Sequence, residues 1–329
     1  ILDGDWSSDV CSSDLMALIT QISRAVGAPG DAALRQVALA EFTANFPLAQ
    51  YAEFYSFTGN SDELRADSGD VQAGETRTTA TSYTAHETPP VFKPVSLKIY
   101  GDIVQTDKAW ERRGQDLDSQ ILYDLRKFAQ GLGRYFMDAL VNHDTGLDST
   151  QLMGWKALIA AGDGEEVQWG TNGTVLDSSS LAAFLELFEE EVQKIPGGPT
   201  VLVANSKLIA RLANLARDFV RVENVQDVFG RTQRLMTFYG IPLVNAGYKN
   251  DGTTYVIPNS ETVGTSTDCT SLYMVRFGER QDVTIATSTG LDVQALGFTG
   301  PKFQTLVEFD VAQVSLNPKS LRRIAGIRF

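Results

Sequence analysis

The side chains that could do enzymatic chemistry are few in this 329-residue chain and follow no catalytic pattern. His86 and His143 are the only histidines; the second ends a predicted helix, where an imidazolium would interact favourably with the helix dipole. Two such isolated histidines offer neither a metal-binding pair nor a Ser-His-Asp triad. No G-x-x-x-x-G-K-[ST] loop is present to bind phosphates. The sequence therefore predicts no catalytic residue, no metal site and no cofactor, and the chain is not expected to be an enzyme.

The other reactive side chains have structural explanations. A run of acidic residues falls within a helix predicted over residues 180–195, and we expect it to form the solvated helix face rather than a metal site. The run comprises Glu186, Glu189, Glu190 and Glu191. Serines 178–180 are available to cap this helix. Cys269 is expected to be a small core residue or an inert exposed thiol.

Residues 4–15 resemble the in-frame translation of a common sequencing-library adapter. We expect residues 1–15 to be a non-native leader, with the native chain beginning at Met16 and with no function for Trp6 or Cys11. The segment lacks the charged and apolar regions of a signal peptide. Removing it removes four aspartates and no basic residue, so the formal net charge changes from −13 to −9.

The composition of the remaining chain limits the classes of function. An acidic chain argues against tight sequence-independent binding of DNA, which depends on Lys and Arg neutralising phosphates. With Cys269 alone, no intrachain disulfide can form, which fits a reducing cytoplasm. No apolar run approaches the roughly 18 residues that a membrane-spanning helix needs.

A polar stretch over residues 68–86 has almost no large apolar side chains, although its threonines and Tyr83 favour strands. Three prolines follow at positions 89, 90 and 94, and residues 95–100 resemble a strand. Because an isolated two-stranded arm is at best marginally stable in water, we expect it to lie against another subunit. A disordered surface loop is the alternative.

A long amphipathic helix is predicted over residues 118–142, about 37 Å in length. Its apolar side chains recur every three or four residues: Leu117, Ile121, Leu125, Phe128, Leu132, Phe136 and Leu140. Asp116 or Asp118 can cap its start. Gly131 and Gly133 weaken the helix, which indicates that another element approaches closely there. An ordinary core helix would show the same stripe.

The remaining pattern mixes helices and strands and predicts an α/β or α+β layer. Further helices are expected over residues 31–44 and 206–217. The first of these is interpreted as part of an N-terminal arm. Strands are expected over residues 200–204, 242–246, 254–257, 272–277, 283–287 and 303–316.

The order of these parts resembles the tailed-phage major capsid proteins of the Hong Kong 97-type fold, over residues 16–329. Supporting phrases are GIPLVN at 240–245, YMVRFG at 273–278, LDVQALG at 291–297, and NP with RRIAGI within 317–327. The resemblance implies an α+β fold that begins with an N-terminal arm over residues 16–56 and an extended β-hairpin loop over 57–105. A peripheral domain with a spine helix follows over 106–151, and an α/β axial domain over 152–290. Residues 291–329 then return to complete the peripheral domain.

This resemblance implies a structural protein that self-assembles into the icosahedral head of a tailed bacteriophage around double-stranded DNA. Expected partners are further copies in pentamers and hexamers, scaffold and portal proteins, and packaged DNA bound without sequence specificity; no membrane is involved. The protein would be located in the virion after assembly in the host cytoplasm. Expected intersubunit contacts are Arg77, Tyr83, Phe92 and Lys98 in the loop, with Glu111, Arg112 and Arg113 at its base. Some relatives cross-link a loop lysine, for which Lys93 and Lys98 are the candidates.

Three other functions stay open at this stage. An encapsulin, a cellular shell that loads an enzyme, would share the fold, and the neighbouring genes would distinguish it. A hydrolase or transferase could use residues 200–245, and a closed pocket with convergent polar groups would support it. A carbohydrate-binding or adhesion module would fit the strands but leaves the long helix unexplained.

Overall fold

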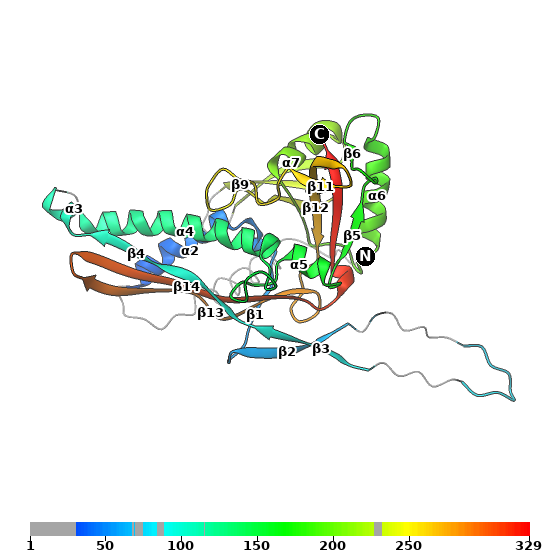
Figure 1. The fold of residues 1–329 in the computed structure, drawn as a ribbon, viewed down its shortest axis with the longest axis horizontal. Helices are drawn as coiled ribbons and strands as arrows, with labels where there is room; N and C mark the ends of the chain where they lie inside the picture. Colours follow the sequence, from blue (N-terminus) through cyan, green and yellow to red (C-terminus); the bar gives the residue numbers. More distant parts are fainter. Residues whose placement is uncertain (1–30, 68, 70–74, 84–88, 115, 227–231) are drawn as a thin grey trace, which may run out of the picture.

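The computed structural model describes residues 31–329 apart from 68, 70–74, 84–88, 115 and 227–231. The expected leader and His86 therefore lie outside the described residues. Figure 1 shows three parts: a mixed α/β body, a long arm that follows helix α4, and a hairpin that projects on the other side. The two projections point to opposite ends of the molecule (Figure 1).

Helix α4 (Leu117–Asn142) confirms the predicted long helix and forms the axis of the arm. Asp116 is its N-cap, with a side-chain oxygen accepting a hydrogen bond from the Ser119 amide. The apolar stripe is buried: Ile121, Leu125, Leu132, Phe136 and Leu140 are among its buried residues. A stripe with this spacing must face a partner along its whole length. One partner is helix α2 and the other is a β-sheet.

Helix α2 (Asp31–Asn45) packs across the middle of α4. Its Phe42 and Phe46 rings lie 6.0 and 4.9 Å from the Phe136 ring, and Phe309 joins the same cluster at 5.1 Å from Phe136. All four rings are almost completely buried. The predicted helix is confirmed, and its aromatic side chains make it part of the core. Its interpretation as part of an N-terminal arm stays a prediction.

The close approach predicted at Gly131 and Gly133 is also confirmed. A Cβ atom on Gly133 would lie 2.8 Å from the Phe42 carbonyl oxygen of α2. A Cβ atom on Gly131 would lie 2.9 Å from the Asn250 side-chain oxygen. Glycine at these positions therefore lets a helix and a loop come within backbone contact distance of α4.

A four-stranded sheet lies beneath α4 along the arm (Figure 1). In spatial order its strands are β1 (Phe54–Ser56), β13 (Val283–Thr299), β14 (Lys302–Ser315) and β4 (Lys98–Asp107). β13 and β14 form a long antiparallel hairpin, and β4 pairs with β14 over ten residues, from Lys98 opposite Val311 to Asp107 opposite Lys302. The predicted strands at 283–287 and 303–316 are thus parts of this ribbon, and β4 belongs to the arm rather than to the projecting loop.

The body is built on a nine-stranded mixed sheet. Along its main path the strands are β5 (Glu165–Gln168), β15 (Leu321–Arg328), β12 (Ser266–Val275), β7 (Val201–Ala204), β10 (Ile241–Asn245), β9 (Thr232–Phe238) and β8 (Val220–Gln226). Beside this path, β6 (Thr174–Val175) pairs with β15 and β11 (Glu261–Val263) pairs with β12.

Strand alternation divides the body into two cores. Val201 and Val203 of β7 point into the core shared with α2, α4 and α5 (Trp155–Ala160). Leu202 and Ala204 point to the opposite core, with α6 (Leu181–Gln193) and α7 (Ser206–Leu215). Because successive strand residues face opposite sides, a strand buried on both faces reads as a continuous apolar run.

Two strand predictions need correction. Residues 254–257 form no strand; only Tyr255 makes an isolated bridge, to Tyr248. Conversely, β8, β9 and β15 were not predicted. β15 carries two consecutive arginines, Arg322 and Arg323, a pattern typical of a surface segment. Every residue from 321 to 327 is nevertheless buried or half-buried.

The prediction that the acidic run forms the solvated face of α6 also needs correction, because Glu191 is only 1% exposed. Its carboxylate accepts a hydrogen bond from Arg322 Nε at 2.7 Å and pairs with Lys194 Nζ at 2.6 Å. Glu186 and Glu190 are exposed as predicted. Ser180 occupies the N-cap position without capping the helix. Cys269, the small core residue that was expected, is buried beside Val263 and Ala325.

Candidate intersubunit surfaces

The base of the projecting hairpin is attached firmly to the rest of the molecule. Strands β2 (Ser61–Ala66) and β3 (Val91–Ser96) pair antiparallel, from Ser61 opposite Ser96 to Ala66 opposite Val91. One face of this pair buries Leu64, Ala66 and Val95 against β1, β13 and β14. The hairpin therefore leaves the molecule at a fixed position and direction (Figure 1).

The described tip of the hairpin is not buried against the rest of the molecule. Every residue from 75 to 83 is exposed. Arg77 lies 5.3 Å from the Tyr83 ring centroid and donates a long 3.4 Å hydrogen bond to the Thr81 carbonyl. The threonine-rich segment has no strand within residues 75–83, which corrects the expectation from β propensity. Propensity alone does not form a strand, because strand formation also depends on packing and pairing with neighbours.

The predicted loop contacts divide into exposed and internally bonded residues. Arg77 and Tyr83 are exposed, and the Phe92 side chain on the outer face of β3 is 55% exposed. Lys98, however, belongs to β4 and donates a 2.6 Å hydrogen bond to the Ser149 carbonyl. Lys93 is bonded internally as well, to Asp163 at 2.6 Å and to the Ser315 carbonyl at 2.7 Å.

Glu111, Arg112 and Arg113 do not lie at the base of the hairpin, which corrects their expected position. Glu111 and Arg112 follow β4 in the short helix α3 (Ala109–Arg112) at the far end of the arm, and Arg113 is the C-cap of that helix (Figure 1). Because β4 runs its ten residues away from the hairpin, it carries them to the opposite end of the molecule. All three side chains are exposed.

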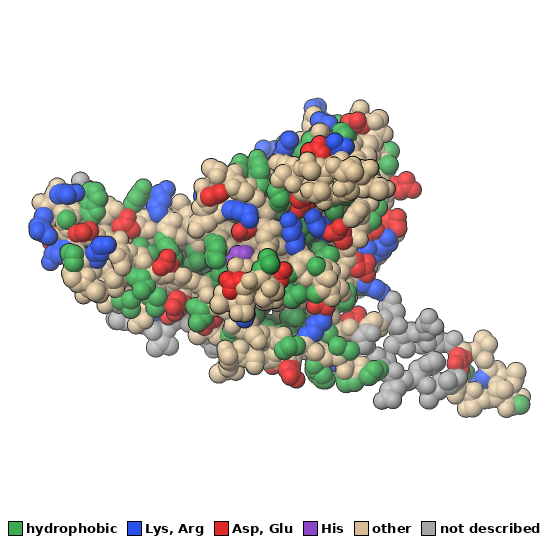
Figure 2. All heavy atoms as spheres, in the orientation of Figure 1, with side chains coloured by type: hydrophobic (Ala, Val, Ile, Leu, Met, Phe, Trp, Pro, Cys, Tyr) green, Lys and Arg blue, Asp and Glu red, His purple; other side chains and the backbone are tan. Residues whose placement is uncertain are grey.

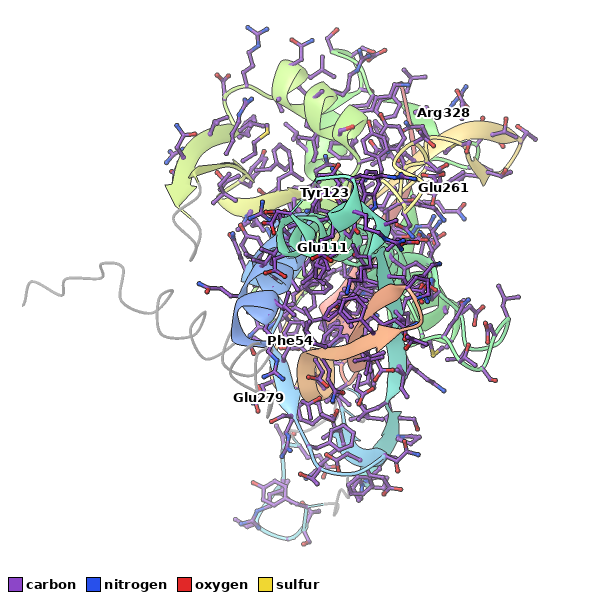
Figure 3. The ribbon with its side chains drawn as sticks, turned by 90° about the vertical axis from the view of Figure 1, so that its left-hand side faces the viewer. Phe54, Glu111, Tyr123, Glu261, Glu279 and Arg328 are labelled. Atoms are coloured by element: carbon purple, nitrogen blue, oxygen red, sulfur yellow. The ribbon has the colours of Figure 1, made fainter. Side chains whose placement is uncertain are left out.

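The far end of the arm combines cations with exposed aromatic rings. Arg113 lies 5.7 Å from the Trp110 ring, and Lys108 lies 5.4 Å from the Phe298 ring. Trp110 is 40% exposed and Phe298 is 51% exposed. Figure 2 shows Lys and Arg side chains gathered at this end, and Figure 3 shows Glu111 and Tyr123 there, facing the viewer. Cationic and aromatic side chains of this kind are enriched in the energetically important parts of protein interfaces.

His143 has a structural role that differs from the one expected. Its Nδ1 lies 3.1 Å from the Tyr100 hydroxyl, and that hydroxyl accepts a hydrogen bond from the Leu152 amide at 2.9 Å. Burial lowers the pKa of His143 below its ordinary value, which disfavours the imidazolium expected at the helix end. The contact between His143 and Tyr100 joins α4 to β4.

A groove of the described surface lies beside residues 200–245, the region of the alternative enzymatic function. The described residues that line it include Arg134, Arg217 and Arg234 but no His, Cys, Asp or Glu. Such a lining offers no general base. Within the described ranges, no group of His, Cys, Asp and Glu side chains is arranged to hold a metal ion. No helix in the described part of the chain is long and apolar enough to cross a membrane.

Solved structures share this architecture. The capsid of a native GTA particle matches with a TM-score of 0.60 at 14% identity, over 86% of this chain and 90% of that one. A structure from Mycobacterium phage Bobi matches with a TM-score of 0.53 at 12% identity, over 86% and 90% of the two chains. The SrpI encapsulin of Synechococcus elongatus matches with a TM-score of 0.55 at 16% identity, over 85% and 87%.

The chain therefore has the Hong Kong 97-type capsid fold, as the order of its parts predicted. Most of the matching structures are phage capsids, and encapsulins also occur among them. No protein-family model and no curated protein matches the sequence. At identities of 12–16% the likeness establishes the fold.

Proposed function

We propose that this chain is the major capsid protein of a tailed bacteriophage and that it assembles into an icosahedral head around double-stranded DNA. The observation that carries the proposal is the hairpin: its base is fixed by the Leu64, Ala66 and Val95 cluster, while its tip projects without support. A two-stranded projection gains a stable conformation from a surface that it lies on. A second copy of the chain supplies such a surface in a shell.

The partners follow from the same proposal. The chain forms pentamers and hexamers with itself, in line with the C5 symmetry of the GTA capsid that it resembles. Scaffold and portal proteins accompany assembly in the host cytoplasm, and the mature chain resides in the virion. Repeated heterologous contacts close the shell and leave no exposed ends. The expected division is part of this proposal, with the axial domain over residues 152–290 and peripheral segments over 106–151 and 291–329.

The contact residues are proposed from their exposure. Arg77, Tyr83 and Phe92 of the hairpin meet one neighbour, and Arg112 and Arg113 at the far end of the arm meet another. Glu111 lies among the latter and limits their net positive charge. Lys98 contributes through its position in β4, because its ammonium group is already bonded to Ser149. The cross-link of some relatives is left out of the proposal, because Lys93 is held in an ion pair with Asp163.

The test is expression of residues 16–329, alone and together with a neighbouring scaffold gene, followed by size-exclusion chromatography and negative-stain electron microscopy. Closed shells or regular capsomers are expected. A monomer under every condition, with the hairpin resistant to protease, would contradict the proposal.

An encapsulin is the second candidate, favoured by the match to the Synechococcus elongatus shell. The genes that flank this one separate the two functions. Terminase and portal genes support the phage head, whereas a gene for an enzyme cargo supports the encapsulin.

A further inference from the structure

A groove of about 820 Å³ lies where four parts of the fold meet. Its walls come from the end of α2 and the 3-10 helix η1 (Pro47–Gln50), from α4, from α7, and from strands β9 and β10. The surface within it is more apolar than polar, with Ile209, Ala210, Ala213, Met236 and Leu243 among the lining residues. A hollow of this size can receive apolar side chains of a ligand.

Three arginines from three different elements surround this apolar surface. Arg134 comes from α4, Arg217 follows α7, and Arg234 comes from β9. Within the described part of the chain, none of them forms an ion pair, and the one hydrogen bond among them joins Arg217 to the Asn214 side chain at 3.0 Å. Arg134 is half-buried, and no carboxylate belongs to the described lining.

The chain carries 41 acidic and 28 basic residues, so carboxylates are in excess. Within the described part of the chain no carboxylate is bonded to these three arginines, so the hollow presents a surface that is complementary to negative charge.

We infer that this groove binds an acidic amphipathic helical segment of a partner protein. The apolar face of the segment packs on Ile209, Met236 and Leu243. Its carboxylates meet the guanidinium groups of Arg134, Arg217 and Arg234, whose planar forks suit bidentate pairing with carboxylates. Helix-in-groove recognition of this kind uses apolar residues at helical spacing for affinity and rim charges for orientation.

Two segments of the same chain do not have the required chemistry. Residues 16–30 carry Arg24 and no carboxylate, so their charge repels the arginines. Helix α6 is acidic, but Phe184 and Phe188 hold its apolar face against the nine-stranded sheet. Nucleic acid would satisfy the arginines through its phosphates but would leave the apolar surface uncovered. A partner protein is thus favoured, and DNA becomes a competing outcome of the test.

The probe is a fluorescein-labelled helical peptide of about 18 residues, or about 27 Å of helix, with leucines on one face and glutamates on the other. Its anisotropy is measured against the full chain. Arg134→Gln, Arg217→Gln and Arg234→Gln are each expected to weaken binding about 2- to 5-fold, and the triple variant more than 10-fold. Arg126→Gln, an exposed arginine of α4 outside the groove, should leave binding unchanged.

Two control ligands decide what the groove recognises. A peptide with lysine in place of glutamate, and one with serine in place of leucine, are both expected to bind far more weakly. Equal binding by the lysine peptide, or binding that the triple variant leaves intact, would overturn the inference. So would a short DNA duplex that depends on the three arginines while the acidic peptide does not bind.

This inference stands apart from shell assembly, and the variants separate the two. Thermal unfolding of each variant confirms its fold, and Arg217 and Arg234 are exposed enough to be changed singly without disturbing the core. Negative-stain microscopy of the triple variant reports assembly. Shells of the wild-type chain that do not bind the peptide refute the groove alone, whereas peptide binding by a wild-type chain that never assembles refutes the shell alone. Triple-variant shells that do not bind the peptide are the expected result.

Discussion

The body and the hairpin satisfy their polar side chains in opposite ways. In the body, Arg322 is 5% exposed and is bonded to Glu191 and Glu165. In the hairpin tip, Arg77 is exposed, and its described contacts are with Tyr83 and Thr81 of the same turn. The body is therefore stabilised by buried contacts within the chain, while the described side chains of the tip lie on the surface. Substitutions in the body should therefore destabilise the single chain, whereas substitutions in the hairpin tip should change its stability little.

Glu191→Ala should have the largest effect, lowering the free energy of unfolding by about 3–5 kcal/mol, because it leaves the buried Arg322 guanidinium without its main partner. Glu186→Ala, five residues earlier on the exposed side of the same helix, is the matched control and should change it by less than about 0.5 kcal/mol. Urea unfolding of both variants measures the difference. Equal effects would mean that the buried pair does not stabilise the body.

Gly133→Ala should be the next most damaging, by about 1–3 kcal/mol, because the new Cβ atom meets the backbone of Phe42 and Asn45 in α2. Gly131→Ala is the control within the same turns of α4. Its Cβ atom meets only the Asn250 side chain, which can rotate away, so the gain in helix propensity of up to about 1 kcal/mol should offset the contact. Thermal unfolding distinguishes the two; a stabilised Gly133→Ala variant would show that α2 does not pack on α4 as described.

Glu261→Gln should change the pH dependence of stability. Burial alone would raise the pKa of Glu261, but the charges of Arg323 and Lys156 outweigh it and hold the pKa below the ordinary 4.5. A lowered folded-state pKa means that the carboxylate stabilises the fold above pH 4.5 and that this contribution is lost as the pH falls through the folded-state pKa. Glu261 lies at one flank of the body, with Arg328 on the same side (Figure 3).

The variant should be less stable than the wild type by about 1–3 kcal/mol at pH 7, and the gap should close in acid. Denaturant unfolding from pH 7 to pH 3 measures both curves. A gap that stays constant over that range would contradict the assigned charge interaction.

Replacing residues 76–83 with a Gly-Ser sequence of equal length should have the smallest effect on the single chain, less than about 0.5 kcal/mol, because these residues are exposed and their described contacts are with one another. The same replacement should abolish assembly. Leu147→Ser is the matched surface control, since Leu147 is 87% exposed and lies outside the hairpin. Analytical ultracentrifugation reports assembly; shells formed by the loop variant would mean that the hairpin tip is not an intersubunit contact.

Local patterns were sufficient to predict helix α4. The features that could not be predicted depend on pairings between residues far apart in the sequence. The 3.6-residue stripe predicted α4, and its two glycines predicted the close approach of α2 and of the loop around Asn250. The burial of Glu191 was not predictable, because its partner Arg322 lies 131 residues away. Strand β15 was not predictable for the same reason. Two adjacent arginines indicate a surface segment unless the carboxylates that pair with them are known.

The candidate contact residues also divide into those that local sequence could predict and those that depend on long-range pairing. Exposure of Arg77, Tyr83 and Phe92 followed from the polar composition of the hairpin. The position of Glu111, Arg112 and Arg113 did not, because it depends on the direction in which β4 pairs with β14. The groove could not be predicted either, since Arg134, Arg217 and Arg234 come together only when α4, α7 and β9 pack.

The most direct test of the central claim is amide hydrogen exchange, read by mass spectrometry, on the assembled particle and on the unassembled chain. If neighbouring subunits hold the hairpin, peptides covering residues 75–83 will exchange fast in the single chain and at least about tenfold more slowly in the particle, while β7 and β12 exchange alike in both. Fast exchange of the hairpin in both states, or a chain that forms no particle under any condition, would contradict the assignment of this molecule as a shell-building protein.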